Sequence, residues 1–153
     1  MFFTKKSLLS VLLALILVFS MVSPASATGA TPRASDYLMS YSAYVYPAGW
    51  YKVQVWVSVN GVDYMDEIGS LTIQLYESKD QETWTWVKTY NFEDTPGMLV
   101  YNDYHHSAHV EYSGTIGRYY KAYVCVWAGK DGDGDTRYFW TIPQKATLFA
   151  GAN

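Results

Sequence analysis

Hydrophobic and polar residues alternate with a period of two along most of the chain after residue 36. In the run WYKVQVWVSVNG, residues 50–61, every second residue from Val53 to Val59 is a valine, and polar or aromatic residues lie between them. This pattern is typical of a β-strand that buries one face, and valine favours strands because it is β-branched. Asn60 and Gly61 then form a turn signal. The run therefore predicts a strand that ends at a turn.

The same alternation predicts seven strands, separated by segments rich in turn-forming residues. The runs are residues 37–49, 50–61, 70–78, 83–92, 107–114, 118–129 and 136–141. After residue 27 no segment has the residue spacing of an amphipathic helix. This pattern predicts an all-β fold, an antiparallel β-sandwich of about seven strands, with a small barrel as the alternative.

The sixth run adds detail to this fold prediction. It resembles the penultimate strand of fibronectin type III and immunoglobulin-like sandwiches, in which a tyrosine near the strand start bonds back to the corner backbone. We assign Tyr120 to this position, with Tyr119 as the alternative. The residues that alternation places in the core are Val53, Val55, Val57, Leu71, Ile73, Leu75, Val110, Tyr120, Ala122, Val124 and Val126.

The first 27 residues have the composition of a secretory signal peptide. Lys5 and Lys6 precede an apolar stretch, and small residues at positions 25 and 27 mark a cleavage site before Thr28. Serines interrupt the apolar stretch, which is shorter than the ~20 residues that a membrane-spanning helix needs. We therefore expect a secreted, extracellular protein without membrane contact after cleavage. Its single domain spans residues 28–153, with flexible tails at 28–35 and 144–153.

Charge and cysteine content narrow the classes of partner. Without Lys5 and Lys6 the chain has 9 basic and 14 acidic residues, a net charge of −5, and no cluster of basic residues. Nucleic acid is therefore not an expected partner, because its binding depends on clustered Lys and Arg. Cys125 is the single cysteine. We expect it to be buried among aromatic residues, with an interchain disulfide as the alternative.

Three longer stretches carry a resemblance to a known family. They are MDEIGSLTIQLYES at 65–78, TWTWVKTY at 83–90 and GRYYKAYVCVWAGKDGDGD at 117–135. Together they resemble a family of small secreted proteins of Gram-positive bacteria that is catalogued as a domain of unknown function. The resemblance implies secretion and a β-rich domain, and it supplies no catalytic residue, ligand or partner.

The acidic stretch GKDGDGDT, residues 129–136, has two interpretations. Asp131, Asp133 and Asp135 match the first three ligand positions of an EF-hand calcium loop. That loop also needs a glycine at its sixth position and a glutamate at its twelfth, where this chain has Thr136 and Ile142. We therefore favour a tight turn between two strands, with glycines at positive φ and no cofactor, and keep a weak calcium site as the alternative.

The three histidines, His105, His106 and His109, lie close together in the sequence. If His105 and His109 share one face of a strand, they are about 13 Å apart, too far for one zinc ion, which needs nitrogens ~2 Å away. We therefore expect solvated loop histidines. Asp66 and Glu67 are adjacent, so a strand would point them to opposite faces. With no recognised catalytic motif, we do not expect an enzyme, and a small hydrolase is the least favoured class.

Aromatic residues form the remaining candidate site. If the third, sixth and seventh strands share a sheet, one outer face carries the candidate binding residues, which are Tyr76, Tyr119, Tyr123, Trp127 and either Tyr138 or Trp140. Exposed aromatic clusters mark recognition surfaces, so we expect this face to bind an extracellular glycan or protein. The alternative is a structural module without a specific ligand, in which cross-strand pairs stiffen the sheet. Trp84, Trp86 and Tyr90 form a second same-face stripe, and for Trp84 and Trp86 we favour packing.

Overall fold

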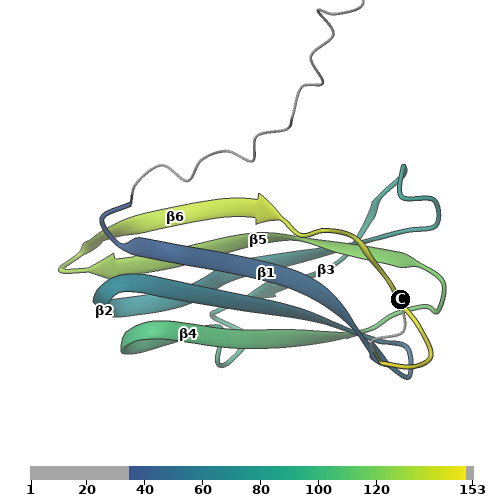
Figure 1. Ribbon diagram of the computed structural model, residues 1–153, viewed down its shortest axis with the longest axis horizontal. Coiled ribbons are helices and arrows are strands. Elements are labelled where there is room, and N and C mark those ends of the chain that lie inside the picture. The colour runs from purple at the N-terminus through teal and green to yellow at the C-terminus, as the bar shows by residue number, and fades with distance from the viewer. Residues whose placement is uncertain (1–34, 151–153) are drawn as a thin grey trace, which may run out of the picture. The chain divides into compact units, whose positions relative to one another are not determined.

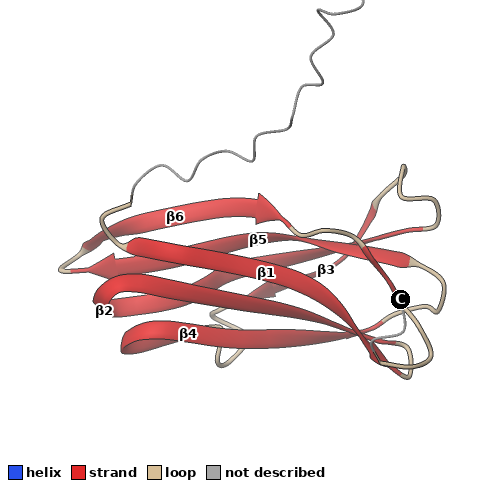
Figure 2. Ribbon diagram, viewed as in Figure 1, coloured by secondary structure: helices blue, strands red, loops and turns tan. Residues whose placement is uncertain are grey.

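The computed structural model describes residues 35–150, and they form an all-β domain with antiparallel strands (Figures 1 and 2). The strands are β1 (Leu38–Gly49), β2 (Lys52–Ser78), β3 (Thr85–Asn91), β4 (Leu99–Ser113), β5 (Tyr119–Lys130), β6 (Asp133–Trp140) and β7 (Gln144–Lys145). No helix that could span a membrane occurs in this part of the chain. The predicted signal peptide, residues 1–27, and residues 28–34 of the predicted N-terminal tail lie outside the described residues.

Strand β2 pairs with four other strands. Its first part, from Lys52, lies between β1 and β4, and its last part, up to Ser78, lies between β3 and β5. Strand β6 then pairs with β5 on the side away from β2. All seven strands therefore belong to one sheet, and β2 is the strand that joins its two halves.

The sheet curls where β2 and β4 bend together. The β2–β4 register is regular up to the pair of Asn60 and His105 and resumes at Met65 and Asp103, so β2 has extra residues at this point. Figure 1 shows β2 and β4 curling over at the left end. The predicted turn at Asn60–Gly61 thus falls at a real change of direction. The prediction that the strand ends there is wrong, because β2 continues as one strand through this bend to Ser78, and its pairing with β4 resumes at Met65.

The curl gives the sheet the form of a half-barrel whose inner surface holds the core. Tyr41 of β1 contacts Phe139 of β6, with ring centroids 5.1 Å apart, and Tyr112 of β4 contacts Tyr120 of β5 at 6.1 Å. The valines at 53, 55, 57 and 59 face the same interior as Ile73. Because apolar and polar side chains alternate along β2 and β5, each half of the sheet has one apolar face. The burial of these two faces against each other brings the two halves into contact.

Ten of the eleven predicted core residues are buried. The exception is Leu71, which is partly exposed. The register of β2 against β5 shifts between Ser70 and Thr72, so a bulge at Leu71 interrupts the alternation. The buried positions on either side of it are Ser70 and Ile73. A bulge inserts one residue and reverses which face the following residues occupy, which sequence periodicity does not predict.

Two boundaries also differ from prediction. Strand β4 extends back to Leu99, so the histidine segment lies in a strand instead of a loop. The segment from residue 144 was expected to be a flexible tail, yet Gln144 and Lys145 pair with β5, and Ala146 is buried. The Ala146 amide donates a hydrogen bond to the Arg118 carbonyl at 2.8 Å. Edge pairing and burial therefore hold the start of this segment against the domain.

The connection between β1 and β2 has an unusual backbone. Trp50 and Tyr51 have φ values of 50° and 68°, a region that bulky side chains rarely adopt. The Trp50 amide donates to the Leu148 carbonyl at 3.0 Å, and the Tyr51 carbonyl accepts from the Gly114 amide at 2.6 Å. Two other segments of the chain thus hold this turn in place.

The corner tyrosine prediction is confirmed for Tyr120. Its side chain is fully buried, and its hydroxyl accepts a hydrogen bond from the Thr115 amide at 2.8 Å and donates to Glu77 at 3.0 Å. The ring packs against Gly114, where a Cβ atom would lie 2.9 Å from the tyrosine ring. Burial raises the pKa of Tyr120. The hydroxyl therefore connects the β4–β5 loop to β2.

We predict that Tyr120→Phe lowers the free energy of unfolding by about 1–2 kcal/mol, because the Thr115 amide loses its acceptor and Glu77 its donor at part-buried positions. Denaturant unfolding measures the change. Tyr119→Phe is the matched control, since it removes the hydroxyl of the neighbouring, partly exposed tyrosine, and it should change stability by less than about 0.5 kcal/mol. Equal losses in the two variants would contradict the assignment of Tyr120 as the corner residue.

Candidate functional site: an outer aromatic platform and an adjacent hollow

The outer face of β3, the second part of β2, β5 and β6 carries a group of aromatic side chains. The strand register places Tyr123 beside Trp140 and Tyr76 beside Lys121. Tyr138 follows on the same face of β6, two residues before Trp140. Three strands and Trp84, the residue directly before β3, therefore contribute to one surface, which we call the aromatic platform and define as Tyr76, Trp84, Lys121, Tyr123, Tyr138 and Trp140.

The rings of the platform contact one another. The centroid of Trp140 lies 4.8 Å from that of Tyr123 and 5.2 Å from that of Tyr76. Tyr123 is also stacked on Tyr138 at 5.9 Å. Tyr138 and Trp140 remain 61% and 49% exposed. The platform is thus a connected aromatic surface whose β6 side is open to solvent.

Lys121 lies between two of the tryptophans. Its Nζ atom is 4.2 Å from the centre of the Trp84 ring and 4.4 Å from that of Trp140. Both distances are within the range of a cation–π interaction. From β5, Lys121 therefore contacts both Trp84, which directly precedes β3, and Trp140 of β6. Its positive charge lies between these two rings.

The structure brings together three of the five predicted binding residues, namely Tyr76, Tyr123 and Trp140. Tyr138, which the sequence offered as an alternative to Trp140, joins them. Tyr119 lies further along β5, where the Nζ atom of Lys145 is 5.5 Å from its ring. Trp127 lies toward the opposite end of β5, at the β5–β6 turn. These two residues therefore flank the ring cluster at its two ends.

The predicted stripe of Trp84, Trp86 and Tyr90 does not share one face. The register of β2 against β3 shifts so that Leu75 pairs with Lys88 while Tyr76 pairs with Trp86. Beyond this irregularity Tyr90 packs against the core, whereas Trp86 is 56% exposed. The interpretation of Trp84 and Trp86 as packing residues is wrong for Trp86, because a bulge displaces the alternation.

A compact loop positions Trp84 on the platform. The Asp80 carboxylate accepts hydrogen bonds from the Glu82 and Thr83 amides, both at 2.9 Å, and from the Ser78 hydroxyl. These bonds, with the Thr83 amide as the largest contribution, lower the pKa of Asp80 to about 2. The indole of Trp84 in turn donates to the Gln81 carbonyl at 3.0 Å. A single carboxylate thus orders the loop that holds Trp84.

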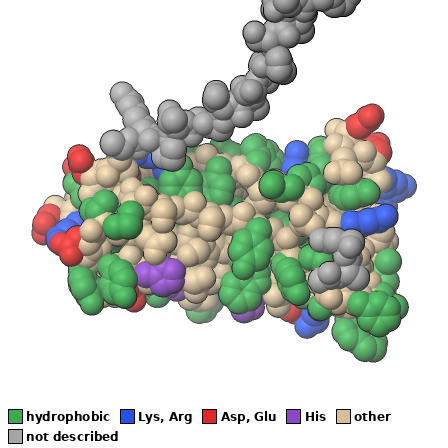
Figure 3. Space-filling view, viewed as in Figure 1, with side chains coloured by type: hydrophobic (Ala, Val, Ile, Leu, Met, Phe, Trp, Pro, Cys, Tyr) green, Lys and Arg blue, Asp and Glu red, His purple; other side chains and the backbone are tan. Residues whose placement is uncertain are grey.

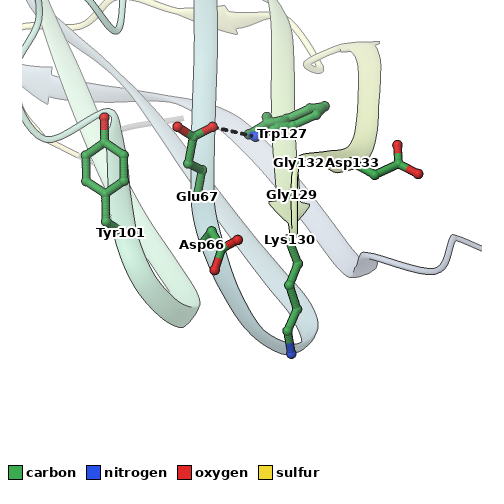
Figure 4. A pocket seen from close by; sticks show the side chains of 8 residues that line it. All are labelled: Asp66, Glu67, Tyr101, Trp127, Gly129, Lys130, Gly132 and Asp133. Atoms are coloured by element: carbon green, nitrogen blue, oxygen red, sulfur yellow. Dashed lines mark hydrogen bonds between the residues drawn. The ribbon is translucent and has the colours of Figure 1, made fainter.

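A hollow of about 340 Å³ lies at the other end of the same outer face, beside the β5–β6 turn (Figure 4). Its residues are Asp66, Glu67, Tyr101, Trp127, Gly129, Lys130, Gly132 and Asp133. Tyr101, Glu67 and Gly129 are direct cross-strand neighbours on β4, β2 and β5. Figure 4 shows Glu67 between the rings of Tyr101 and Trp127.

Glycines create the space that Trp127 occupies. A Cβ atom on Gly129 or Gly134 would lie 2.5 Å from the Trp127 ring, so the indole lies directly on their backbone. Its Nε1 atom donates to Glu67 at 3.2 Å. Trp127 therefore has a fixed orientation, and its packing on glycine explains why it is only partly exposed. The sequence shows the glycines, but not the register that places them under this ring.

Carboxylates dominate the charge around the hollow. Asp66 and Glu67 both line it, and Figure 4 shows their carboxylates directed to different sides. They follow directly on the bend of β2, where the register is irregular. The positive charge of Lys130 is paired with Asp63 at 3.0 Å, and Figure 4 shows the lysine side chain directed away from Glu67. Figure 3 shows Asp and Glu side chains gathered at this left-hand end of the domain.

The acidic stretch forms the expected tight turn. Asp131 and Gly132 connect β5 to β6 with φ values of 56° and 82°, as a two-residue type I′ turn requires. The positive φ at Gly134 that a hairpin role implied is not observed, because Gly134 is paired with Gly129 in the ladder.

The three aspartates of this turn make separate contacts. The Asp131 amide donates to the Asp66 carboxylate at 2.7 Å, Asp133 accepts from the Gly134 amide, and Asp135 bonds to Ser35. Within residues 35–150, no three His, Cys, Asp or Glu side chains are arranged to hold a metal ion. The weak calcium site therefore stays an untested alternative without geometric support in these side chains.

The histidines of β4 have three different environments. His105 shares a hydrogen bond with Asn60 at 2.8 Å, His106 with the Gly97 carbonyl at 2.7 Å, and His109 stacks on Trp56 at 4.5 Å. They are strand residues, so the loop assignment is corrected. Each ring has its own partner, which explains their presence without a shared ligand.

Cys125 is buried on the platform side of β5, beneath Tyr138. Burial raises the pKa of its thiol. The prediction of a buried cysteine among aromatic residues is confirmed, and an interchain disulfide would require the thiol to become exposed.

Comparisons with known proteins do not assign a family. The sequence matches no protein-family model and no curated protein. Among solved structures, the domain is similar to Spo0M, a sporulation control protein from Bacillus subtilis, with 13% sequence identity and a TM-score of 0.38. The similarity covers 67% of this chain and 47% of the Spo0M chain.

We predict that Asp80→Ala releases Trp84 from Lys121, because the loop loses three hydrogen bonds. In NMR spectra the Lys121 side-chain protons should lose the part of their ring-current shift that Trp84 contributes and keep the part from Trp140, and the Glu82 and Thr83 amides should exchange faster. Acid should act in the same direction: the pKa of Asp80 is depressed to about 2, so the ordering persists above about pH 4 and is lost as the pH falls through about 2.

Glu82→Ala is the control for this experiment. It removes an exposed carboxylate from the same loop and keeps the backbone amide that bonds to Asp80. Its spectra should match those of the parent protein. Unchanged Lys121 shifts in Asp80→Ala would show that Trp84 is held by the platform alone.

Proposed function

We propose that this chain is a non-catalytic, secreted binding module whose aromatic platform binds an extracellular glycan. The observation that carries the proposal is the connected ring cluster of Tyr123, Tyr138 and Trp140 on an exposed sheet face. Rings that remain exposed after they are ordered can stack on a sugar at low cost in conformational entropy. Secretion, inferred from the predicted signal peptide, would place this face outside the cell.

Polar groups among the rings favour a glycan over a protein partner. The Tyr76 hydroxyl donates to Gln74 at 3.0 Å on the same strand, and Lys121 lies between the rings. A sugar offers apolar C–H groups and hydroxyls together, which suits alternating rings and polar atoms. A protein interface would instead favour a continuous apolar centre with a polar rim.

A structural module is the second candidate. The contacts of Lys121 with Trp84 and Trp140 at 4.2 and 4.4 Å favour it, because they show rings engaged by the protein itself. In this case the platform would stiffen a curled sheet that has no disulfide. We further infer that the domain is a variant of the fibronectin type III or immunoglobulin-like sandwich, with the Tyr120 corner bond as support.

We predict that replacing Tyr138 and Trp140 together by Ala abolishes glycan binding and lowers stability by about 0.2–1 kcal/mol per lost ring pair. The mature protein is first screened on a glycan array, and retention is then measured on insoluble cellulose, chitin and purified peptidoglycan. Denaturant unfolding of the same variant gives its stability.

Tyr44→Ala is the matched control, because this tyrosine is 54% exposed on the outer face of the opposite half of the sheet, beside Trp56. It should bind as the parent does. Unchanged binding by the double variant would refute the platform as the binding site. A destabilised double variant, from a parent that binds no glycan, would assign the rings to the structural module.

A further inference from the structure

The hollow beside the β5–β6 turn lies on the same outer face as the aromatic platform. Along β5 the side chains of Lys121, Tyr123, Cys125 and Trp127 point to this face in succession. Six residues separate Lys121 from Trp127, which is about 20 Å at ~3.3 Å per residue. A chain-like ligand on the platform can therefore continue into the hollow.

The size and walls of the hollow suit one small ring or group. Its volume of about 340 Å³ is at the lower end of the ~300–1,000 Å³ that small-molecule sites occupy. Tyr101, which is 64% exposed, and Trp127 supply aromatic surfaces on two sides of Glu67. Gly129, which has no side chain, lets the Trp127 ring lie flat on the backbone as one wall of the hollow. The hollow is thus suited to one compact unit at the end of a chain-like ligand, because such a unit can stack on these aromatic rings.

The charge of the hollow selects the chemistry of that unit. Asp66, Glu67 and Asp133 line it, and the ammonium group of Lys130 is paired with Asp63 outside it. One oxygen of Glu67 accepts from Trp127, and Figure 4 shows the other directed to the side on which Tyr101 lies. A cation between aromatic rings and a carboxylate is stabilised by both.

We propose that the hollow binds the protonated amine of an amino sugar, at the end of a glycan whose other units lie on the platform. This inference rests on the proposed function and adds a specificity to it. The carboxylate of Glu67 bonds the ammonium group, and Trp127 and Tyr101 hold the sugar ring. An N-acetylated sugar lacks this charge and loses that bond.

Calorimetric titration of the mature protein with three hexasaccharides tests the proposal. The probes are a glucosamine oligomer, an N-acetylglucosamine oligomer and a cello-oligomer. We expect the glucosamine oligomer to bind about three- to tenfold more tightly than the other two, because it adds one partly exposed charge pair and one cation–π contact. The preference should decrease with added salt and disappear at a pH where the amine is neutral.

Glu67→Gln removes the charge and retains an oxygen that can accept from Trp127. It should remove the preference for the glucosamine oligomer and leave the neutral cello-oligomer unaffected. Tyr101→Ala, at an exposed position, should weaken the same preference without a risk to folding. Glu93→Gln makes the same charge change in the exposed β3–β4 loop and should bind all three probes as the parent does.

The outcomes separate the two proposals. If all three oligomers bind equally and Trp140→Ala abolishes their binding, the platform function holds and the amino-sugar site is refuted. If no oligomer binds, both proposals fail. If an oligolysine peptide binds more tightly than the glucosamine oligomer and depends on Glu67, the hollow recognises protein cations, and the amino-sugar proposal is overturned.

Discussion

The continuity of β2 is the constraint on which the rest of the structure depends. Because Lys52–Ser78 is one strand that pairs with neighbours in both halves, it joins the two halves into a single sheet. The bend after Asn60 then decides which surfaces face inward. It brings the valines of the first half against Ile73 and its neighbours in the second, with Tyr120 buried among them, and it leaves the aromatic platform outside.

Much of this architecture could be predicted from alternation alone. Val53, Val55 and Val57 are buried as their spacing requires, because a strand directs successive side chains to opposite faces. The corner bond of Tyr120 was also predictable, since glycines precede a strand that begins with tyrosine. In both cases a local pattern sets the outcome, and distant parts of the chain only have to be compatible with it.

The failures have a common cause in register. Leu71 and Trp86 changed their environment because a bulge nearby shifts the pairing by one residue, and no periodicity in the sequence records that shift. The hollow could not be predicted for the same reason. It requires Tyr101, Glu67 and Gly129 to be neighbours on three strands. Their separation along the sequence predicts this contact only when the order and register of those strands are known. The platform was predicted in part, because Tyr123 and Trp140 need only adjacent strands.

The turn at Trp50 and Tyr51 has a consequence for the order of folding. Hairpins that form early usually have Asn or Gly at positions of positive φ, so that the turn closes by local interactions. Here two bulky residues occupy those positions, and the hydrogen bonds that hold them come from Gly114 and Leu148, far along the chain. The first hairpin is therefore a poor nucleus. We therefore expect strand β1 to settle on β2 late in folding, once the segments around Gly114 and Leu148 are in place, although the two strands are neighbours in sequence.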